Sequence, residues 1–233
     1  MIDAKRIKLL AFDADDTLWD CQSYFDVVEE KYTTILSDYG SPDDISASLF
    51  KIESANMPSL GYGCKAFILS LIENAIAISH GSLPTEKVGE IMTLGKELLN
   101  MPATPLPNVV ATLKTLKKRE GNYKTIVFTK GELLDQENKL KRSGLSELFD
   151  EIIVVSDKTQ KEYLNLCKRF DCTIEDLVMV GNSFRSDIDP VLQLGGSAIY
   201  LPSQTLWQHE MAEEYEHERL VILKSFSELI NIL

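Results

Sequence analysis

Two aspartates, Asp13 and Asp15, follow directly on an apolar run, Lys8–Phe12. Carboxylates this close together repel each other, so at least one has a raised pKa unless a cation lies between them. A hard divalent ion such as Mg²⁺ takes carboxylate and backbone carbonyl ligands and would remove the repulsion. The spacing predicts a cation site where Asp13 attacks phosphorus as a nucleophile and a protonated Asp15 acts as general acid and then as base. The simpler alternative is a turn or cap, the role that we expect for Asp16 and Thr17.

Polar groups that suit a phosphate follow the next two apolar runs. Thr129 offers a hydroxyl and the N–H groups after it for phosphate oxygens, and Lys130 adds a positive charge. Taken alone, these two residues are more simply a strand-end threonine and a solvated lysine. Lys158 opens a predicted helix, where the helix dipole disfavours a cation. A lysine there indicates a function, namely to counter the charge of the phosphate and the nucleophile. Lys161, one turn further on, is the competing candidate.

The segment "GNSFRSDIDP" follows the fourth run. Asn182 and Asp187 are its candidate metal ligands, or they orient metal-bound water. Asp189 precedes Pro190, which predicts a helix N-cap and a structural role. The four runs are thus followed, in chain order, by a carboxylate pair, a hydroxyl, a cation and a metal-side carboxylate. This set matches a phosphoryl-transfer site built from positioning and charge neutralisation.

The elements that must position these residues are short and almost continuously apolar, which is typical of parallel strands buried on both faces. Predicted helices at 107–121, 132–144, 158–170 and 189–196 alternate with them from Pro107 onward. We therefore predict an α/β fold with a doubly wound, parallel, Rossmann-like sheet, in which ligands bind at the carboxyl ends of the strands. The expected strands are Lys8–Phe12, Thr125–Phe128, Ile152–Val155, Leu177–Val180, Ala198–Leu201 and Leu220–Leu223.

More than a hundred residues separate the first two strands, which is too long for one crossover connection. Apolar residues in this stretch recur at helical spacing, with helices expected from near Ser23, from near Asp43, around Phe67 and after Thr85. The sequence thus predicts an all-helical cap at 20–102, inserted after the first strand of an α/β hydrolase core formed by 1–19 and 103–233.

Composition limits the possible partners. The chain has 233 residues, with 24 Lys and Arg against 36 Asp and Glu, so its net charge is −12. This balance argues against nucleic acid and against anionic membrane surfaces, and any phosphorylated substrate needs a local cation or lysines. The four cysteines form no CxxC pair, and no histidine lies beside an obvious nucleophile. No apolar stretch reaches membrane-span length and no signal-peptide core is found, so we expect a cytoplasmic protein.

These motifs resemble those of the haloacid dehalogenase superfamily of phosphohydrolases, in its capped phosphatase branch. The resemblance covers roughly 7–19 and 107–202. The family motif DxDxT matches the segment from Asp13 to Thr17, and it implies that Asp13 is the nucleophile and Asp15 the general acid/base, whose backbone carbonyl also binds Mg²⁺. Thr129 matches the second motif and Lys158 the third.

The fourth motif departs from the family pattern. Asn182 stands where most members have Asp, and Asp187 matches the second acidic position. An asparagine removes one negative charge from the metal shell but still offers a carbonyl oxygen. Haloacid dehalogenases need no metal, yet they typically lack the second aspartate of the first motif, which is present here as Asp15. The pattern therefore favours a phosphatase.

The resulting hypothesis is a Mg²⁺-dependent phosphohydrolase that acts on a small phosphorylated metabolite through an aspartyl-phosphate. Phosphate binding is assigned to Thr129, Lys130 and Lys158, and metal binding to Asp13, Asp15, Asn182 and Asp187. A phosphomutase or a 2-haloacid dehalogenase on the same scaffold is the alternative. A non-enzymatic alternative is a receiver-like signalling or binding module, which also uses paired aspartates, a threonine and a lysine. Neither the substrate nor the oligomeric state follows from the sequence.

Overall fold

The structure is a computed structural model that describes residues 2–119, 123–203, 205 and 207–233. The chain divides into two compact units, Met1–Gln22 with Ala103–Leu233, and Ser23–Pro102. We call the first the core unit and the second the helical unit. No helix in the described ranges is long and apolar enough to cross a membrane.

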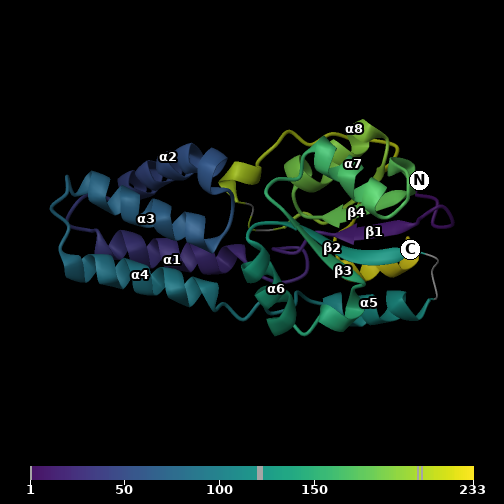
Figure 1. The fold of residues 1–233 in the computed structure, drawn as a ribbon, viewed down its shortest axis with the longest axis horizontal. Coiled ribbons are helices and arrows are strands. Elements are labelled where there is room, and N and C mark those ends of the chain that lie inside the picture. Colours follow the sequence, from purple (N-terminus) through teal and green to yellow (C-terminus); the bar gives the residue numbers. More distant parts are fainter. Residues whose placement is uncertain (1, 120–122, 204, 206) are drawn as a thin grey trace. The chain divides into compact units, whose positions relative to one another are not determined.

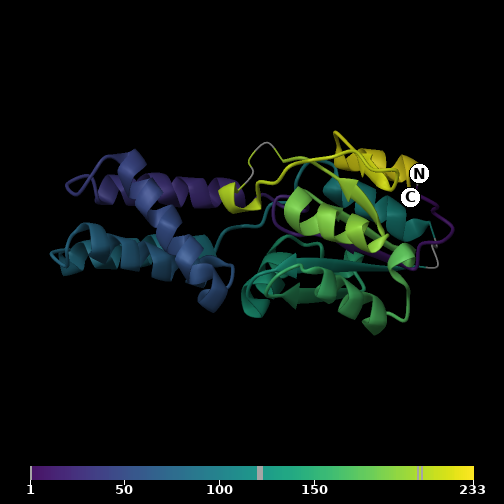
Figure 2. The ribbon, with the colours of Figure 1, turned by 90° about the horizontal axis from the view of Figure 1, so that it is seen from above.

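Six strands of the core unit form one parallel sheet in the order β3-β2-β1-β4-β5-β6 (Figures 1 and 2). The order runs outward in both directions from β1, as in a doubly wound sheet. The predicted fold class is confirmed, and each predicted strand lies within two residues of its observed bounds. The strands are β1 Leu9–Phe12, β2 Lys124–Lys130, β3 Glu151–Val155, β4 Leu177–Gly181, β5 Ser197–Tyr200 and β6 Leu220–Ile222.

Alternate side chains of the strands enter two separate cores. In β1, Leu10 and Phe12 pack with the helix after Pro107 and the C-terminal segment, whereas Leu9 and Ala11 pack with the helices that follow β3 and β4. Both faces are apolar because helices cover both, which is why these strands lack polar alternation. The helices are α5 Val109–Lys118, α6 Leu133–Arg142, α7 Gln160–Arg169 and α8 Asp189–Leu194, with short 3₁₀ turns at Ser146–Leu148, Ile174–Asp176, Gln208–Glu210 and Phe226–Asn231.

The start of α8 differs from the prediction. Asp189 is not an N-cap as predicted, because it already has helical backbone angles and Ile188 precedes α8 as its cap. A turn of π-helix at Phe184–Ile188 runs directly into α8, so the helical backbone begins one turn earlier than the Asp-Pro signal indicates. The end predicted at Gly121 lies outside the described residues.

The helical unit contains α1 Gln22–Ile35, α2 Pro42–Leu60, α3 Cys64–Ile78 and α4 Thr85–Leu99. Its interior includes a buried polar contact, in which Asn74 donates to the Tyr32 hydroxyl at 2.8 Å and Tyr32 donates to the Leu71 carbonyl at 2.9 Å. Helix α4 approaches α3 closely, since a Cβ at Gly95 would lie 2.2 Å from the Ile68 side chain.

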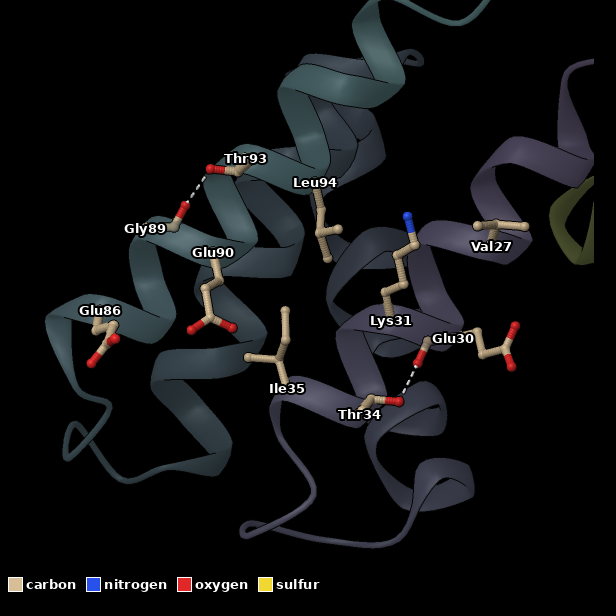
Figure 3. A pocket seen from close by; sticks show the side chains of 10 residues that line it. All are labelled: Val27, Glu30, Lys31, Thr34, Ile35, Glu86, Gly89, Glu90, Thr93 and Leu94. Carbon is tan, nitrogen blue, oxygen red and sulfur yellow. Dashed lines mark hydrogen bonds between the residues drawn. The ribbon is translucent and has the colours of Figure 1, made fainter.

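An open groove of about 990 Å³ runs between α1 and α4 (Figure 3). Apolar residues such as Ile35 and Leu94 form part of its lining, but Glu30, Glu86 and Glu90 border it as well. Three carboxylates disfavour a phosphate there, so we do not place the phosphate site in this groove.

Candidate active site

The carboxyl ends of β1, β2 and β4 lie side by side, because β1 pairs in parallel with both neighbours. Asp13 is the first residue beyond β1, and its N–H donates to the Val180 carbonyl of β4 at 2.9 Å. Thr129 is a buried residue of β2, two positions beyond the Phe12–Val127 pair. The sheet edge therefore brings Asp13, Thr129 and the loop after β4 to the same region.

Lys158 joins two of the carboxylates at this edge. Its Nζ lies 2.5 Å from Asp13 Oδ1 and 2.6 Å from Asp187 Oδ1, and the residue is 3 % exposed. Burial alone would lower the pKa of Lys158, but the charges of Asp13 and Asp187 raise it by more, so the net shift of the pKa is upward. The ammonium thus remains charged beside Asp13. Lys161, the competing candidate, is exposed.

Asp187 is held by a tight loop. Its Oδ1 accepts from Lys158, and its Oδ2 accepts the Ser183 N–H at 3.0 Å. Burial first, and then the Asp13 charge, raise the pKa of Asp187 against the lowering effect of Lys158. Gly181 makes room for this carboxylate, because a Cβ there would lie 2.2 Å from Asp187 Oδ2. The two oxygens of Asp187 are therefore occupied by protein donors.

The other oxygen of Asp13 faces a group of oxygen-bearing partners that would suit a cation. The Thr17 hydroxyl lies 3.0 Å from Asp13 Oδ2 and 3.0 Å from the Asn182 amide. The same amide position is 3.2 Å from Asp13 Oδ2 and 3.3 Å from the Asp15 carbonyl oxygen. With its nitrogen there, the two N–H groups of Asn182 have three acceptor oxygens within hydrogen-bond distance. With its oxygen there, the amide accepts from the Thr17 hydroxyl and faces the Asp13 and Asp15 oxygens without a proton between them, an arrangement that a cation would stabilise.

These spacings fit Mg²⁺. An octahedral ion with ligands at about 2.1 Å holds neighbouring oxygens about 3 Å apart, close to the 3.2 and 3.3 Å found around Asn182. No cluster of three or more carboxylate, imidazole or thiolate side chains arranged for a metal occurs in the described ranges. A cation here would be held by Asp13, the amide oxygen of Asn182 and the Asp15 carbonyl, whereas Asp187 lies against Lys158.

The Asp15 side chain turns to a different set of partners. It accepts from Trp19 Nε1 at 2.7 Å, from Gln136 Nε2 at 2.8 Å and from Lys139 Nζ at 2.7 and 2.8 Å. Burial raises the pKa of Asp15, but the charge of Lys139 and these hydrogen bonds lower it overall. The sequence predicts a raised pKa in one member of the Asp13–Asp15 pair unless a cation intervenes. In the structure Asp15 contacts Lys139 and Asp13 contacts Lys158, and the net shift of the Asp15 pKa is downward.

Lys130 belongs to a third buried ion pair. Its Nζ contacts the Glu210 carboxylate, lies 2.9 Å from Ser186 Oγ, and is 4.0 Å from Asp157. Glu210 also accepts from the hydroxyls of Ser183 and Ser186. This network links the end of β2 to the loop after β4. The structure therefore places Lys130 against Glu210 and Ser186, and its phosphate-binding role stays a prediction.

Comparison with known proteins identifies the family. Residues 7–195 match the family described as haloacid dehalogenase-like hydrolase. The chain belongs to the haloacid dehalogenase-like hydrolases. A crystal structure of a family member from Xanthomonas campestris is similar over 99 % of this chain and 91 % of its own, with a TM-score of 0.88 and 33 % identity. The family predicted from the motifs is thus confirmed.

Two other comparisons bear on the activity. A glyceraldehyde 3-phosphate phosphatase of Methanothermobacter thermautotrophicus is 26 % identical over 97 % of this chain and 100 % of its own length. A 2-haloacid dehalogenase of Pseudomonas syringae has a TM-score of 0.64 and 21 % identity over 97 % of both chains, which shows the fold alone. The predicted enzyme class, a phosphatase of the haloacid dehalogenase-like family, is confirmed.

Sequence reasoning about this hydrolase missed three residues of the site: Gln136, Lys139 and Glu210. One signal was available, because α6 must bury a face against the core and few of its residues are apolar. Gln136 and Lys139 lie one turn apart on that face and are buried. A buried lysine needs an acid partner, which the sequence alone does not identify. Glu210 comes from an irregular segment without periodicity, and nothing in its surroundings marks it.

Proposed function

We propose that this chain is a Mg²⁺-dependent phosphatase of a small phosphorylated metabolite, working through an aspartyl-phosphate on Asp13. The observation that carries the proposal is the division of labour at the Asp13 carboxylate. Oδ1 pairs with Lys158 at 2.5 Å, whereas Oδ2 faces the Asn182 amide and the Thr17 hydroxyl. One oxygen can thus help to hold a cation while the other is available to phosphorus.

The charge balance of the site supports a divalent ion. Five carboxylates and three ammonium groups leave a formal charge of −2, and a phosphate monoester would add about −2 at neutral pH. A divalent cation reduces that excess and supplies charge stabilisation at the phosphoryl oxygens. The groups are Asp13, Asp15, Asp135, Asp187, Glu210, Lys130, Lys139 and Lys158.

In the proposed reaction Asp13 attacks phosphorus and the bond to the leaving oxygen breaks. Asp15, protonated at the start of the cycle, gives that oxygen its proton and becomes a carboxylate, the form that its hydrogen bonds from Lys139, Gln136 and Trp19 stabilise. Asp15 then accepts a proton from the water that hydrolyses the aspartyl-phosphate, which frees phosphate and restores Asp13. Lys158 and Thr129 neutralise and bind the phosphoryl oxygens.

The Methanothermobacter relative supports a short phosphorylated sugar or triose as the substrate class. We infer that the helical unit serves as the predicted cap, because capped sites exclude water and select substrates. The absence of a disulfide among the four cysteines, all in the described ranges, fits the reducing cytoplasm.

Phosphate release from a panel of monophosphates, with and without Mg²⁺, tests the function. We expect Asp13→Asn to lose at least about 10³-fold in kcat, because the nucleophile is removed. Asp43→Asn, an exposed aspartate at the start of α2, serves as the matched control and should keep full activity. Full turnover by the Asp13 variant would exclude the mechanism. Isomer interconversion without phosphate release would indicate a mutase, and halide release from a 2-haloacid would indicate a dehalogenase.

A further inference from the structure

Four hydrogen bonds fill the Asp15 carboxylate. Oδ1 accepts from Trp19 Nε1 at 2.7 Å and from Lys139 Nζ at 2.8 Å, and Oδ2 accepts from Gln136 Nε2 at 2.8 Å and from Lys139 Nζ at 2.7 Å. An ionised carboxylate has about four acceptor positions, so all of them are taken. Lys139 is 2 % exposed and Trp19 is fully buried, which makes these donors part of the rigid interior.

Helix α6 is arranged to deliver two of these donors. Gln136 and Lys139 lie three residues apart and therefore share one face of the helix. Gln136 Nε2 also donates to the Lys130 carbonyl at 3.0 Å, which ties the side chain to the end of β2. Gly131 permits this approach: its φ is +129°, and a Cβ there would lie 3.1 Å from Gln136 Nε2.

The hydrogen bonds donated by its NH₂ group set the orientation of the Gln136 side-chain amide. Its Oε1 is buried and has no hydrogen-bond partner within the described part of the chain. A buried amide oxygen without a partner costs about 1–3 kcal/mol. The structure accepts this cost and keeps the NH₂ group on Asp15 and on the Lys130 carbonyl, so the contact to Asp15 is the one that the fold maintains.

We propose that Lys139, Gln136 and Trp19 are positioning residues that fix the carboxylate plane of Asp15 for proton transfer to the leaving group. This inference rests on the proposed function, in which Asp15 is the general acid/base. Lys139 contacts both oxygens, so it can keep one hydrogen bond and release the other when a proton arrives. The two neutral donors, Trp19 and Gln136, hold the plane of the carboxylate meanwhile.

Leaving-group dependence separates positioning from mere structural support. A p-nitrophenolate leaves without needing a proton, whereas an alkoxide needs one, and general acid catalysis contributes about 10²–10⁴-fold. We compare kcat/KM for p-nitrophenyl phosphate with kcat/KM for the best alkyl monophosphate of the panel, because kcat/KM reports the step in which the leaving group departs. Asp15→Asn should lower the alkyl value far more than the aryl value.

Lys139→Met and Gln136→Met should show the same selective loss, about 10–100-fold for the alkyl phosphate and less than about 3-fold for the aryl phosphate. Lys141→Met, at an exposed position of the same helix, is the matched control and should change neither. Because Lys139→Met leaves the partly exposed Asp15 and the buried Asp135 without this cation, thermal melting checks the fold. Trp19→Phe keeps the lysine and an aromatic ring but removes the indole N–H, and it gives a second test if the lysine variant unfolds.

Two failures are distinguishable. If Asp15→Asn lowers both substrates equally or lowers neither, the proposed role of Asp15 is wrong. If Asp15→Asn shows the selective loss but the folded Gln136, Trp19 and Lys139 variants lower both substrates equally, or lower neither, the proposed function stands and the positioning role is overturned. An increase in alkyl phosphate turnover by these variants would also overturn the positioning role, because the contacts would then keep Asp15 from protonating the leaving group.

Discussion

Asn182→Asp restores the charge that most family members carry at this position and tests where the cation binds. The amide atom that faces Asp13 lies 3.2 Å from Asp13 Oδ2. Two unit charges at that distance repel by about 5 kcal/mol at an effective dielectric constant of 20, and relaxation reduces this to about 1–3 kcal/mol. Without metal, the variant should therefore be less stable than the wild type. A divalent ion bound between the two carboxylates should instead make the variant more stable than the wild type, because each carboxylate then attracts the ion.

Two measurements test this prediction: the Mg²⁺ requirement of the activity and the thermal stability with and without Mg²⁺. The Mg²⁺ concentration for half-maximal phosphatase activity should fall by about 5–100-fold, which corresponds to 1–3 kcal/mol. The melting temperature in EDTA should fall by several degrees, and excess Mg²⁺ should recover it. An unchanged Mg²⁺ requirement together with unchanged stability in EDTA would show that the cation does not bind at Asn182. The substitution keeps the volume of the side chain, so packing does not confound the result.

Three further outcomes follow from the packing and charges. Gly181→Ala should lower the free energy of unfolding by about 2–4 kcal/mol and lower activity at least tenfold, because its Cβ would overlap Asp187. In chemical denaturation the control Gly89→Ala, whose Cβ meets open space on α4, should be neutral or slightly stabilising. Equal changes in the free energy of unfolding for the two variants would refute the overlap. Glu210→Gln should cost about 2–4 kcal/mol by leaving a buried ammonium without its carboxylate, and a urea midpoint equal to that of the wild type would contradict this. Burial raises the pKa of Glu53 from 4.5 to about 7, so its contribution to stability falls as pH rises from 4.5 through 7; Glu53→Gln should stabilise by about 1–3 kcal/mol at pH 8 and have no effect at pH 4, and a pH-independent difference would refute the assignment.

The strands and the strand-end residues were predictable because both depend on local sequence. A strand buried on both faces is apolar throughout, and the first polar residues after it lie at the sheet edge by necessity. Asp13 belongs to this class, Lys158 and Asp187 follow in the segments after β3 and β4, and the fold brings both carboxylates within hydrogen-bond distance of the Lys158 ammonium.

The partners of Asp15 were not predictable in the same way. Lys139 lies 124 residues from Asp15 in the chain, and their contact depends on how α6 is rotated about its own axis. Helical periodicity predicts which residues share a face but not what that face meets. The start of α8 shows the same limit, because the π-helical turn before it leaves no mark in the sequence and overrides the Asp-Pro signal.

The distribution of lysines explains how a chain of net charge −12 can receive a phosphate. Lys130 pairs with Glu210, and Lys139 pairs with Asp15 and lies 3.8 Å from Asp135. Lys158 is shared by Asp13 and Asp187, so one negative charge stays uncompensated beside the proposed nucleophile. An isolated excess charge in a buried place is costly, and a divalent cation next to Asp13 would offset it and give the group of Asp13, Asp187 and Lys158 a net positive charge toward the phosphate. Affinity for the metal and affinity for the substrate therefore have the same electrostatic origin, and we expect each to increase when the other ligand is bound.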